Sequence, residues 1–185
     1  FCMINADPHP GNYLFHDDGS VSFFDFGCVK RFSREQIDSV TVLMRECLRG
    51  DVDGTWRASV ESGFFAPSGA LTAEEVFEYW HAPIEMYWGE QPFTVTPEYV
   101  AKWIELRYSP TSPLANAFRH LSPPTDHTIM GRIDIGVMSL ISQLHGTNHW
   151  NMIAAEYFED ADPTTPMGKA HRAHHEQRQA TSSHA

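Results

Sequence analysis

The order of apolar and polar positions predicts a chain that begins with short strands and continues mainly as helices. Residues 12–15 and 20–24 are short apolar runs, and the polar segment His16–Gly19 between them ends in glycine. Two such runs joined by a tight turn are typical of an antiparallel hairpin. From residue 33 onward the apolar side chains recur instead at helical spacing. The predicted fold class is therefore α+β and mostly helical, with one short β-hairpin.

Local signals locate the starts of several helices. Ser33 with Gln36, and Thr72 with Glu75, have the spacing of a capping box, in which two side chains satisfy backbone N–H groups at a helix start. The first of these helices is expected to stop at Gly50. The sequence thus predicts well-defined helices directly after the strands.

A long helix is predicted over residues 126–145, where apolar positions again follow a helical period. We expect its residues Ile133, Val137 and Leu140 to be buried. Residues 1–158 are predicted to form one folded domain. Residues 159–185 carry almost no apolar side chains, so they are predicted to form a polar, disordered tail.

Composition excludes several classes of partner. The chain has 185 residues, of which 42% are hydrophobic, and this content supports a folded body. A formal net charge of −11 argues against nucleic-acid binding, although it leaves peripheral apolar contact with a membrane open. The cysteines are few, odd in number and without C-x-x-C spacing, which is typical of free thiols in a reducing compartment. We therefore expect a cytoplasmic protein.

The candidate chemistry lies at the start of the chain. Asp7 and Asn12 flank the rigid sequence Pro-His-Pro-Gly, and Asp25 ends the second arm of the predicted hairpin. A hairpin brings its two open ends together, so Asn12 should lie close to Asp25, with Asp7 one loop away. Two carboxylates and an amide offer the hard oxygen ligands that magnesium takes, usually together with waters and substrate phosphates.

This frame is the protein-kinase signature, in which a catalytic-loop D-x-x-x-x-N is followed by D-F-G. Here the two motifs are Asp7 to Asn12 and Asp25 to Gly27. More specifically, "ADPHPGN" with "DFGCVKRF" resembles the AarF/UbiB family of atypical, protein-kinase-like ATPases, which are linked to ubiquinone and other isoprenoid-lipid metabolism. The resemblance is sharp over residues 5–32 and loose over the helical region.

The resemblance implies a role for each motif residue. Asp7 would be the catalytic aspartate that orients or deprotonates the phosphoryl acceptor, and Asn12 and Asp25 would bind the magnesium ions of Mg2+–ATP. The fold implied for residues 1–158 is a protein-kinase-like C-terminal lobe whose hairpin carries the metal-binding motif. His9 is expected to support the loop, and the DFG aromatic, Phe26, is expected to pack in the core.

Other family elements are not found in this sequence. No glycine-rich phosphate loop and no V-A-I-K-like strand occurs, and the lysines, at 30, 102 and 169, all follow DFG. We therefore expect the N-terminal lobe to be a partner supplied by the rest of a longer protein, and residues 1–185 alone to be inactive. Isoprenoid lipid or lipid-biosynthesis proteins are the further partners that the resemblance implies. Asn5 departs from the His that commonly precedes "AD" in that family.

Two alternatives remain open at this point. A small-molecule phosphotransferase of the aminoglycoside or choline kinase type shares the D-x-x-x-x-N loop, but DFG followed by "CVKRF" argues against it. A non-catalytic, kinase-derived binding module would keep the motif only to bind nucleotide or as a relic. Intact Asp7, Asn12 and Asp25 argue against complete loss of function.

Overall fold

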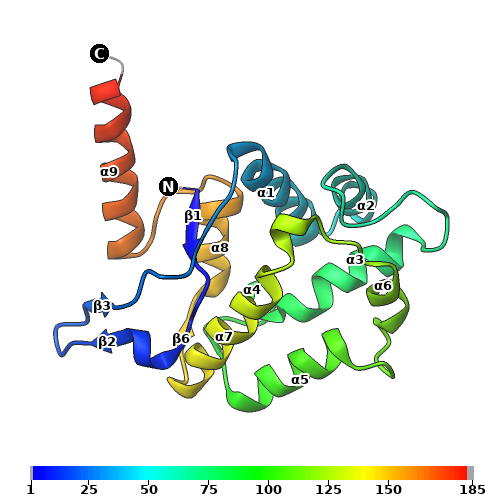
Figure 1. The fold of residues 1–185 in the computed structure, drawn as a ribbon, viewed down its shortest axis with the longest axis horizontal. Coiled ribbons are helices and arrows are strands. Elements are labelled where there is room, and N and C mark those ends of the chain that lie inside the picture. Colours follow the sequence, from blue (N-terminus) through cyan, green and yellow to red (C-terminus); the bar gives the residue numbers. More distant parts are fainter. Residues whose placement is uncertain (1, 183–185) are drawn as a thin grey trace.

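The computed structural model describes residues 2–182, with side chains up to residue 178, and most of this part of the chain is helical (Figure 1). The helices are α1 (Arg34–Leu48), α2 (Val52–Glu61), α3 (Ala73–His81), α4 (Glu85–Trp88), α5 (Pro97–Tyr108), α6 (Ala115–His120), α7 (Met130–Gln143), α8 (Trp150–Phe158) and α9 (Pro166–Ser182). Short 3-10 turns are η1 (Pro10–Asn12), η2 (Ala82–Ile84) and η3 (Thr125–His127). The strands are β1 (Met3–Asn5), β2 (Tyr13–Phe15), β3 (Val21–Phe23), β4 (Val29–Arg31), β5 (Phe93–Thr94) and β6 (Thr147–Asn148). The mostly helical α+β class is confirmed.

The described strands pair as two-stranded antiparallel sheets. In the predicted hairpin, β2 pairs with β3 so that Tyr13 lies opposite Phe23. Asp18 Oδ1 accepts a hydrogen bond from Ser20 N at 2.9 Å, and Gly19 adopts φ +80°, a conformation in which a side chain would be strained. The hairpin is therefore confirmed. Strand β1 pairs with β4, and β5 pairs with β6; the sequence analysis predicted neither sheet.

The predicted capping boxes are present at both helix starts. Ser33 accepts from Gln36 N while the Gln36 side chain accepts from Ser33 N, and Thr72 with Glu75 repeats the arrangement on α3. Each box satisfies two backbone N–H groups that the first turn leaves without a helical partner. The first helix ends just before Gly50, which adopts φ +73°.

The helices bury two apolar clusters. The larger cluster joins α1, α2, α3, α6 and the connecting loops, and its members are Leu43, Cys47, Ala58, Phe64, Phe65, Val76, Tyr79, Trp80, Leu114 and Ala117. Inside it, Trp80 Nε1 donates to Ser59 Oγ at 2.9 Å, so this buried indole keeps a partner. The smaller cluster, around Met86, Val95 and Val100, lies where α4 and α5 meet partly buried residues of α7 and α8.

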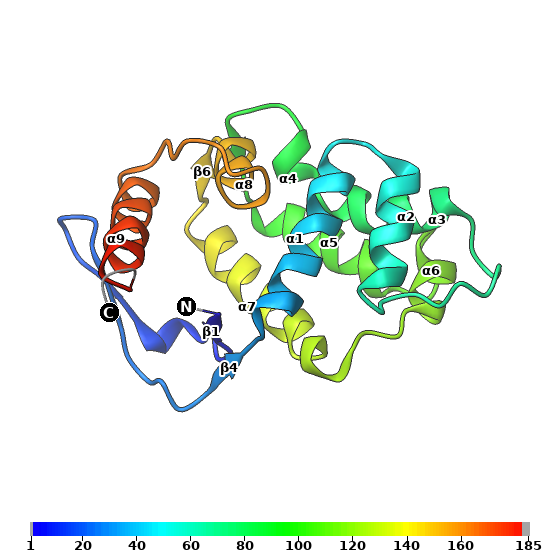
Figure 2. The same cartoon turned by 90° about the horizontal axis from the view of Figure 1, so that it is seen from above.

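Helix α7 lies between the N-terminal strands and the helical body (Figure 2). Ile133 is buried, as predicted, but Val137 is 37% exposed and Leu140 only partly buried, so the prediction that this whole face is buried was wrong. One turn of α7 packs instead against the loop that carries Pro8. The periodic pattern marked an apolar face correctly, but it could not show that a small loop covers only part of it.

The end of the chain differs from the disordered tail that its composition predicts. Residues 166–182 form α9, which stands apart from the body in Figure 1. Arg172 holds its first turns, because its guanidinium lies 2.7 Å from Asp162 Oδ1 and donates to Ala161 O at 2.6 Å. The segment has one large apolar residue, Met167, but it contains three alanines, two glutamines and two arginines, which favour helix. Within residues 2–182, no helix combines the length and the apolar character that a bilayer crossing requires.

Candidate functional site

The N-terminal segment, residues 3–31, holds the loop with the candidate catalytic residue. Ala6 at the end of β1 is completely buried, and its N–H donates to Cys28 O at 2.8 Å, which extends the β1–β4 pairing. The chain then turns sharply, since His9 N donates to Asp7 O at 2.7 Å and Asn12 N donates to His9 O at 2.9 Å. His9 also accepts from Gly11 N through its Nδ1, so it supports the loop.

The loop brings the side chains of Asp7 and Asn12 together. Asn12 Nδ2 lies 3.2 Å from Asp7 O and 3.4 Å from Asp7 Oδ2. The other carboxylate oxygen, Asp7 Oδ1, accepts from Arg132 Nη2 on α7 at 2.8 Å. Asp7 is therefore held from two sides by groups that are 5 and 125 residues away in the sequence.

Asp25 lies directly beyond the open end of the hairpin. Phe24 N donates to Asn12 O at 2.8 Å, which ties the residue before Asp25 to the start of the other arm. Asp25 has φ +57°, and its Oδ1 accepts from Gly27 N at 2.8 Å. A non-glycine residue in this left-handed region costs energy, and such residues occur often at functional sites.

Asn5 connects the two motifs. Its Oδ1 accepts from Asp7 N at 2.9 Å, and its Nδ2 donates to Asp25 O at 3.3 Å. An amide can make both bonds at once because it carries a donor and an acceptor. Asn5 therefore bridges the loop that carries Asp7 and the segment Asp25-Phe26-Gly27.

Asn12 and Asp25 carry oxygen atoms of the kind that magnesium binds. Asn12 uses its amide nitrogen for Asp7, which leaves its carbonyl oxygen for a ligand, and Asp25 provides a carboxylate. Among residues 2–182, no group of three or more His, Cys, Asp or Glu side chains is arranged to hold a metal ion. Magnesium commonly takes one or two protein oxygens and completes its shell with waters and phosphates, so the oxygen types of Asn12 and Asp25 suit magnesium. Of the three predicted site residues, Asp7 and Asn12 are the pair whose side chains are in hydrogen-bond contact.

The sequence analysis missed the support that α7 gives to this loop. Arg132 pairs with Asp7, and Gly136, one turn further along α7, faces Pro8 so closely that a methyl group there would collide with Pro8 Cγ. The spacing of four residues puts Arg132 and Gly136 on one helix face. No local signal in the sequence connects that face to a loop more than 120 residues earlier.

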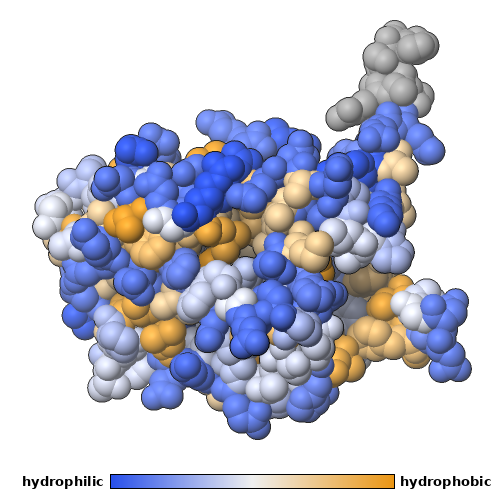
Figure 3. Space-filling view, turned by 180° about the vertical axis from the view of Figure 1, so that it is seen from behind, coloured by the Kyte–Doolittle hydropathy of each residue, from blue (hydrophilic) through white to orange (hydrophobic). Residues whose placement is uncertain are grey.

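Apolar side chains around the motif are exposed, contrary to the prediction for Phe26. Phe26 is 67% exposed, and the neighbouring Phe23 and Phe24 are about half exposed. Figure 3 shows the hydrophobic surface of the hairpin where it projects from the body. The DFG segment lies outside both apolar clusters, so Phe26 has no core in which to pack.

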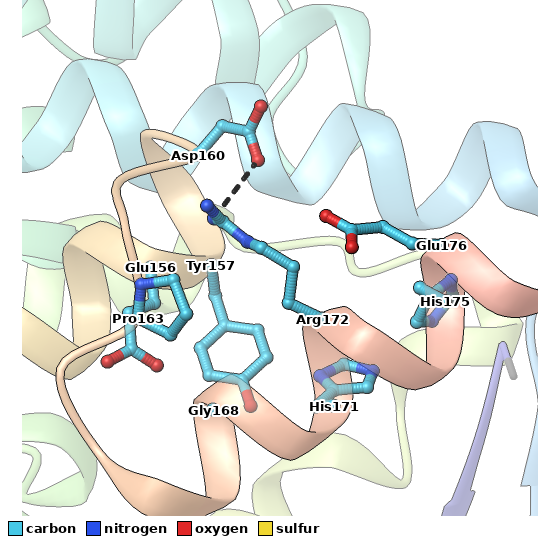
Figure 4. A pocket seen from close by; sticks show the side chains of 9 residues that line it. All are labelled: Glu156, Tyr157, Asp160, Pro163, Gly168, His171, Arg172, His175 and Glu176. Carbon is cyan, nitrogen blue, oxygen red and sulfur yellow. Dashed lines mark ion pairs between the residues drawn. The ribbon is translucent and has the colours of Figure 1, made fainter.

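A cavity of about 500 Å³ lies between α8 and α9 (Figure 4). Its lining is mainly polar and includes Tyr157, His171 and Arg172; Arg172 Nη2 lies 3.8 Å from Asp160 Oδ1. The rings of His171 and His175 are 4.8 Å apart, and burial together with the neighbouring His171 lowers the pKa of His175. This cavity contains none of the residues predicted for the catalytic site.

Comparison with known proteins supports the kinase-like interpretation of the N-terminal region. The model of the ABC1 atypical kinase-like domain matches residues 1–59. A search of curated proteins found no match. The solved complex of Rv3197 with erythromycin from Mycobacterium tuberculosis has a TM-score of 0.62 and 19% sequence identity to this chain. The match covers 88% of this chain and 40% of that one, so the chain spans less than half the length of its structural relative. Residues 1–59 thus resemble the ABC1 atypical kinase-like domain, and the chain as a whole shares the fold of a part of that structure.

Proposed function

We propose that this chain supplies the catalytic and magnesium-binding half of an atypical kinase or ATPase of the AarF/UbiB type. The observation that carries the proposal is the contact of Asp7 with Asn12, 3.4 Å apart at a loop whose hairpin leads directly to Asp25. The match of residues 1–59 to a kinase-like domain supports it independently. In protein kinases the motifs that carry phosphoryl transfer occur in this same order along the chain, with D-x-x-x-x-N before D-F-G.

In this proposal Asp7 acts on the phosphoryl acceptor. Arg132 binds one carboxylate oxygen and Asn12 contacts the other, which fixes the carboxylate. Each oxygen keeps a second lone pair, with which it can take the proton of the hydroxyl or water that attacks the phosphate. Arg132 is a positioning residue, since it contacts Asp7 and acts through it. Asn12 and Asp25 would bind magnesium, which supplies charge neutralisation to the nucleotide phosphates when bound.

The proposal also covers the groups that bind the nucleotide phosphates. Phosphoryl transfer needs groups that grip the phosphates, and no glycine-rich loop or lysine precedes Asp7 in this sequence. We place them in an N-terminal lobe of a longer protein. We extend the proposal to a cytoplasmic protein with peripheral membrane contact and a link to ubiquinone or other isoprenoid-lipid metabolism, as the motifs of residues 5–32 suggest.

Nucleotide binding tests the magnesium site in this chain. We expect residues 1–185 to bind ADP weakly and only with magnesium, and Asp25→Asn to weaken that binding about tenfold or more, because a carboxylate in the metal shell is lost while the shape is kept. Asp17→Asn, in the exposed hairpin turn, is the matched control. Isothermal titration with and without magnesium measures both. Binding that ignores magnesium, or an unchanged Asp25→Asn variant, would contradict the proposal.

Turnover tests the catalytic role and separates the alternatives. We expect no ATP hydrolysis above background from residues 1–185, because positioning and charge stabilisation supply most of the rate. In the longer protein, Asp7→Asn and Asp25→Asn should each abolish metal-dependent phosphate release. Nucleotide binding without any turnover there would favour the binding module, and turnover only with an amino alcohol or aminoglycoside would favour the small-molecule phosphotransferase.

A further inference from the structure

A second cavity of about 500 Å³ opens on the helical body between α5 and the corner where α3 gives way to α4. The side chains used in the argument below are Glu78, His81, Glu85, Trp88, Lys102 and Trp103, all of which line it. None of its lining residues belongs to the N-terminal segment. The cavity is therefore separate from the proposed nucleotide site.

One wall of the cavity is a fixed aromatic stack. The ring of His81 lies between Phe77 and Trp88, with centroid distances of 4.7 Å on both sides and interplanar angles of 19° and 11°. Trp88 Nε1 donates to His81 O at 2.9 Å, which fixes the indole, yet Trp88 remains 45% exposed. An exposed but immobilised indole is ready to contact a ligand without loss of side-chain entropy.

The base of the cavity is also fixed. The Tyr99 hydroxyl donates to Pro83 O and accepts from Met86 N, both at 3.3 Å, and so ties α5 to the corner. Burial, with a smaller contribution from Glu85, raises the pKa of Tyr99 to about 12, so the hydroxyl stays neutral at pH 7. Trp103, which is almost completely buried, completes the apolar lining from α5.

The charges of the side chains that line the cavity are net negative. Glu78 and Glu85 contribute two negative charges and Lys102 one positive charge, a sum of −1, and burial lowers the pKa of His81 so that its ring is neutral at pH 7. Within the described part of the chain, neither carboxylate forms an ion pair with Lys102. Both carboxylates are thus available to a cation.

A neighbouring group of aromatic rings, which shares Trp103 with the cavity, already holds a cation inside the protein. The Arg107 guanidinium carbon lies 5.2, 5.6 and 5.9 Å from the ring centroids of Tyr79, Trp80 and Trp103. These distances are within the range of cation–π attraction. Trp103 therefore takes part in one cation–π contact and also lines the cavity.

We propose that this cavity binds an organic cation, namely an ammonium group carried on an apolar skeleton. The aromatic walls fit both the apolar body and the positive charge, and Glu78 and Glu85 provide the counter-charge. A volume of about 500 Å³ is within the range of small-molecule sites. The positive charge of Lys102 disfavours a bound cation. Removal of this charge should therefore tighten binding of the cation.

The probe for the test is benzyltrimethylammonium, with the anion phenylmethanesulfonate as its charge-reversed comparison. Titration of the 185-residue chain, followed by the indole N–H signals in ¹H–¹⁵N spectra, should shift the signals of Trp88 and Trp103 and leave that of Trp56 unchanged. Binding of the cation should be at least threefold tighter than binding of the anion. Thermal melting of every variant checks that it is folded.

Substitutions then separate aromatic from charge contributions. Trp88→Ala should weaken binding of the cation roughly 3- to 30-fold, the range that a cation–π contact supplies. Glu85→Gln should weaken it and Lys102→Gln should tighten it, each by about two- to fivefold, whereas Glu90→Gln and Trp56→Phe should leave it unchanged. If Trp88→Ala is unfolded, Trp88→Leu replaces it.

Several results would overturn the proposal. One is equal or tighter binding of the anion, and another is weaker binding of the cation after Lys102→Gln. Absence of indole shifts at Trp88 up to millimolar cation in the folded chain would overturn it as well. None of these outcomes depends on ATP or magnesium, so the result is independent of the function proposed above.

Discussion

The N-terminal segment and the helical body differ in how far their apolar side chains are buried. In the body, large side chains such as Tyr79, Leu43 and Ile133 are almost completely buried. In the N-terminal segment, Phe15, Phe23, Phe24, Phe26 and Leu14 are each about half exposed or more. Burial of an apolar side chain supplies about 1.5–3 kcal/mol, so the stability of the molecule comes mainly from the body.

The candidate site is on the less stable side of this division. Within residues 3–31, β1 pairs with β4. The segment also contacts residues 126–136 of the body. These contacts are the ion pairs of Asp7 with Arg132 and of Lys30 with Asp126, and the packing of Pro8 on Gly136. The difference implies that motif residues can be changed without unfolding the body.

The largest effect should come from the core of the body. Leu43→Ala leaves a cavity in the larger cluster and should lower the free energy of unfolding by about 2–5 kcal/mol. Phe26→Ala, at an exposed position, should change it by less than about 0.5 kcal/mol. Urea unfolding of both variants measures the difference, and equal losses would remove the distinction between the two regions.

The contact between Pro8 and α7 gives the next effect. Gly136→Ala forces a methyl group against a rigid ring and should cost about 1–3 kcal/mol, less the roughly 0.5–1 kcal/mol that alanine adds to helix stability. The loss should be local, so amide hydrogen exchange should rise in residues 5–12 and stay unchanged in α1–α3. Uniformly faster exchange would show instead that loop and body unfold together.

The His127 ring contacts Phe32, the residue directly after the N-terminal segment, at 5.4 Å and Phe64 at 5.3 Å between centroids. Its Nδ1 is buried without a hydrogen-bond partner in the described structure, and burial lowers the pKa of the ring below the ordinary 6.5. At pH values below 6.5, the His127 ring binds a proton more readily in the unfolded chain than in the folded protein. The free energy of unfolding should therefore fall as the pH decreases from about 7 toward 5.

The His127→Phe variant should keep the ring contacts and lose this pH dependence. Thermal melting between pH 5 and 7 measures it, with the exposed His120→Phe as the control. A wild-type chain that becomes more stable over the same acid range would contradict the buried, neutral imidazole.

The smallest effect is expected for the ion pair beside the motif. Arg132 has a side chain that is 67% exposed, so Arg132→Gln should change stability by only about 0–1 kcal/mol. A double-mutant cycle with Asp7→Asn isolates the pair. A coupling above about 2 kcal/mol would mean that the pair stabilises the fold as well as holding Asp7 in position.

Predictions that rest on local signals agree with the structure. The hairpin of residues 13–23 and both capping boxes depend on neighbours within a few residues, and all are present. The proximity of Asp7 and Asn12 follows in the same way, because four intervening residues with two prolines and a glycine leave the loop few conformations. Asn5 bridges the two motifs through side-chain bonds that no pattern in the sequence indicated.

Local signals in the sequence were sufficient for the hairpin, for the capped starts of α1 and α3 and for the motif residues, because capping and turn signals act over short distances. What covers each apolar face depends on the tertiary structure. Val137 is partly exposed although its position is apolar, Phe26 lies outside the core, and Arg132 contacts Asp7 across 125 residues. A periodic pattern shows that a face is apolar but not which segment lies against it, because such long-range packing depends on the positions of all the helices together.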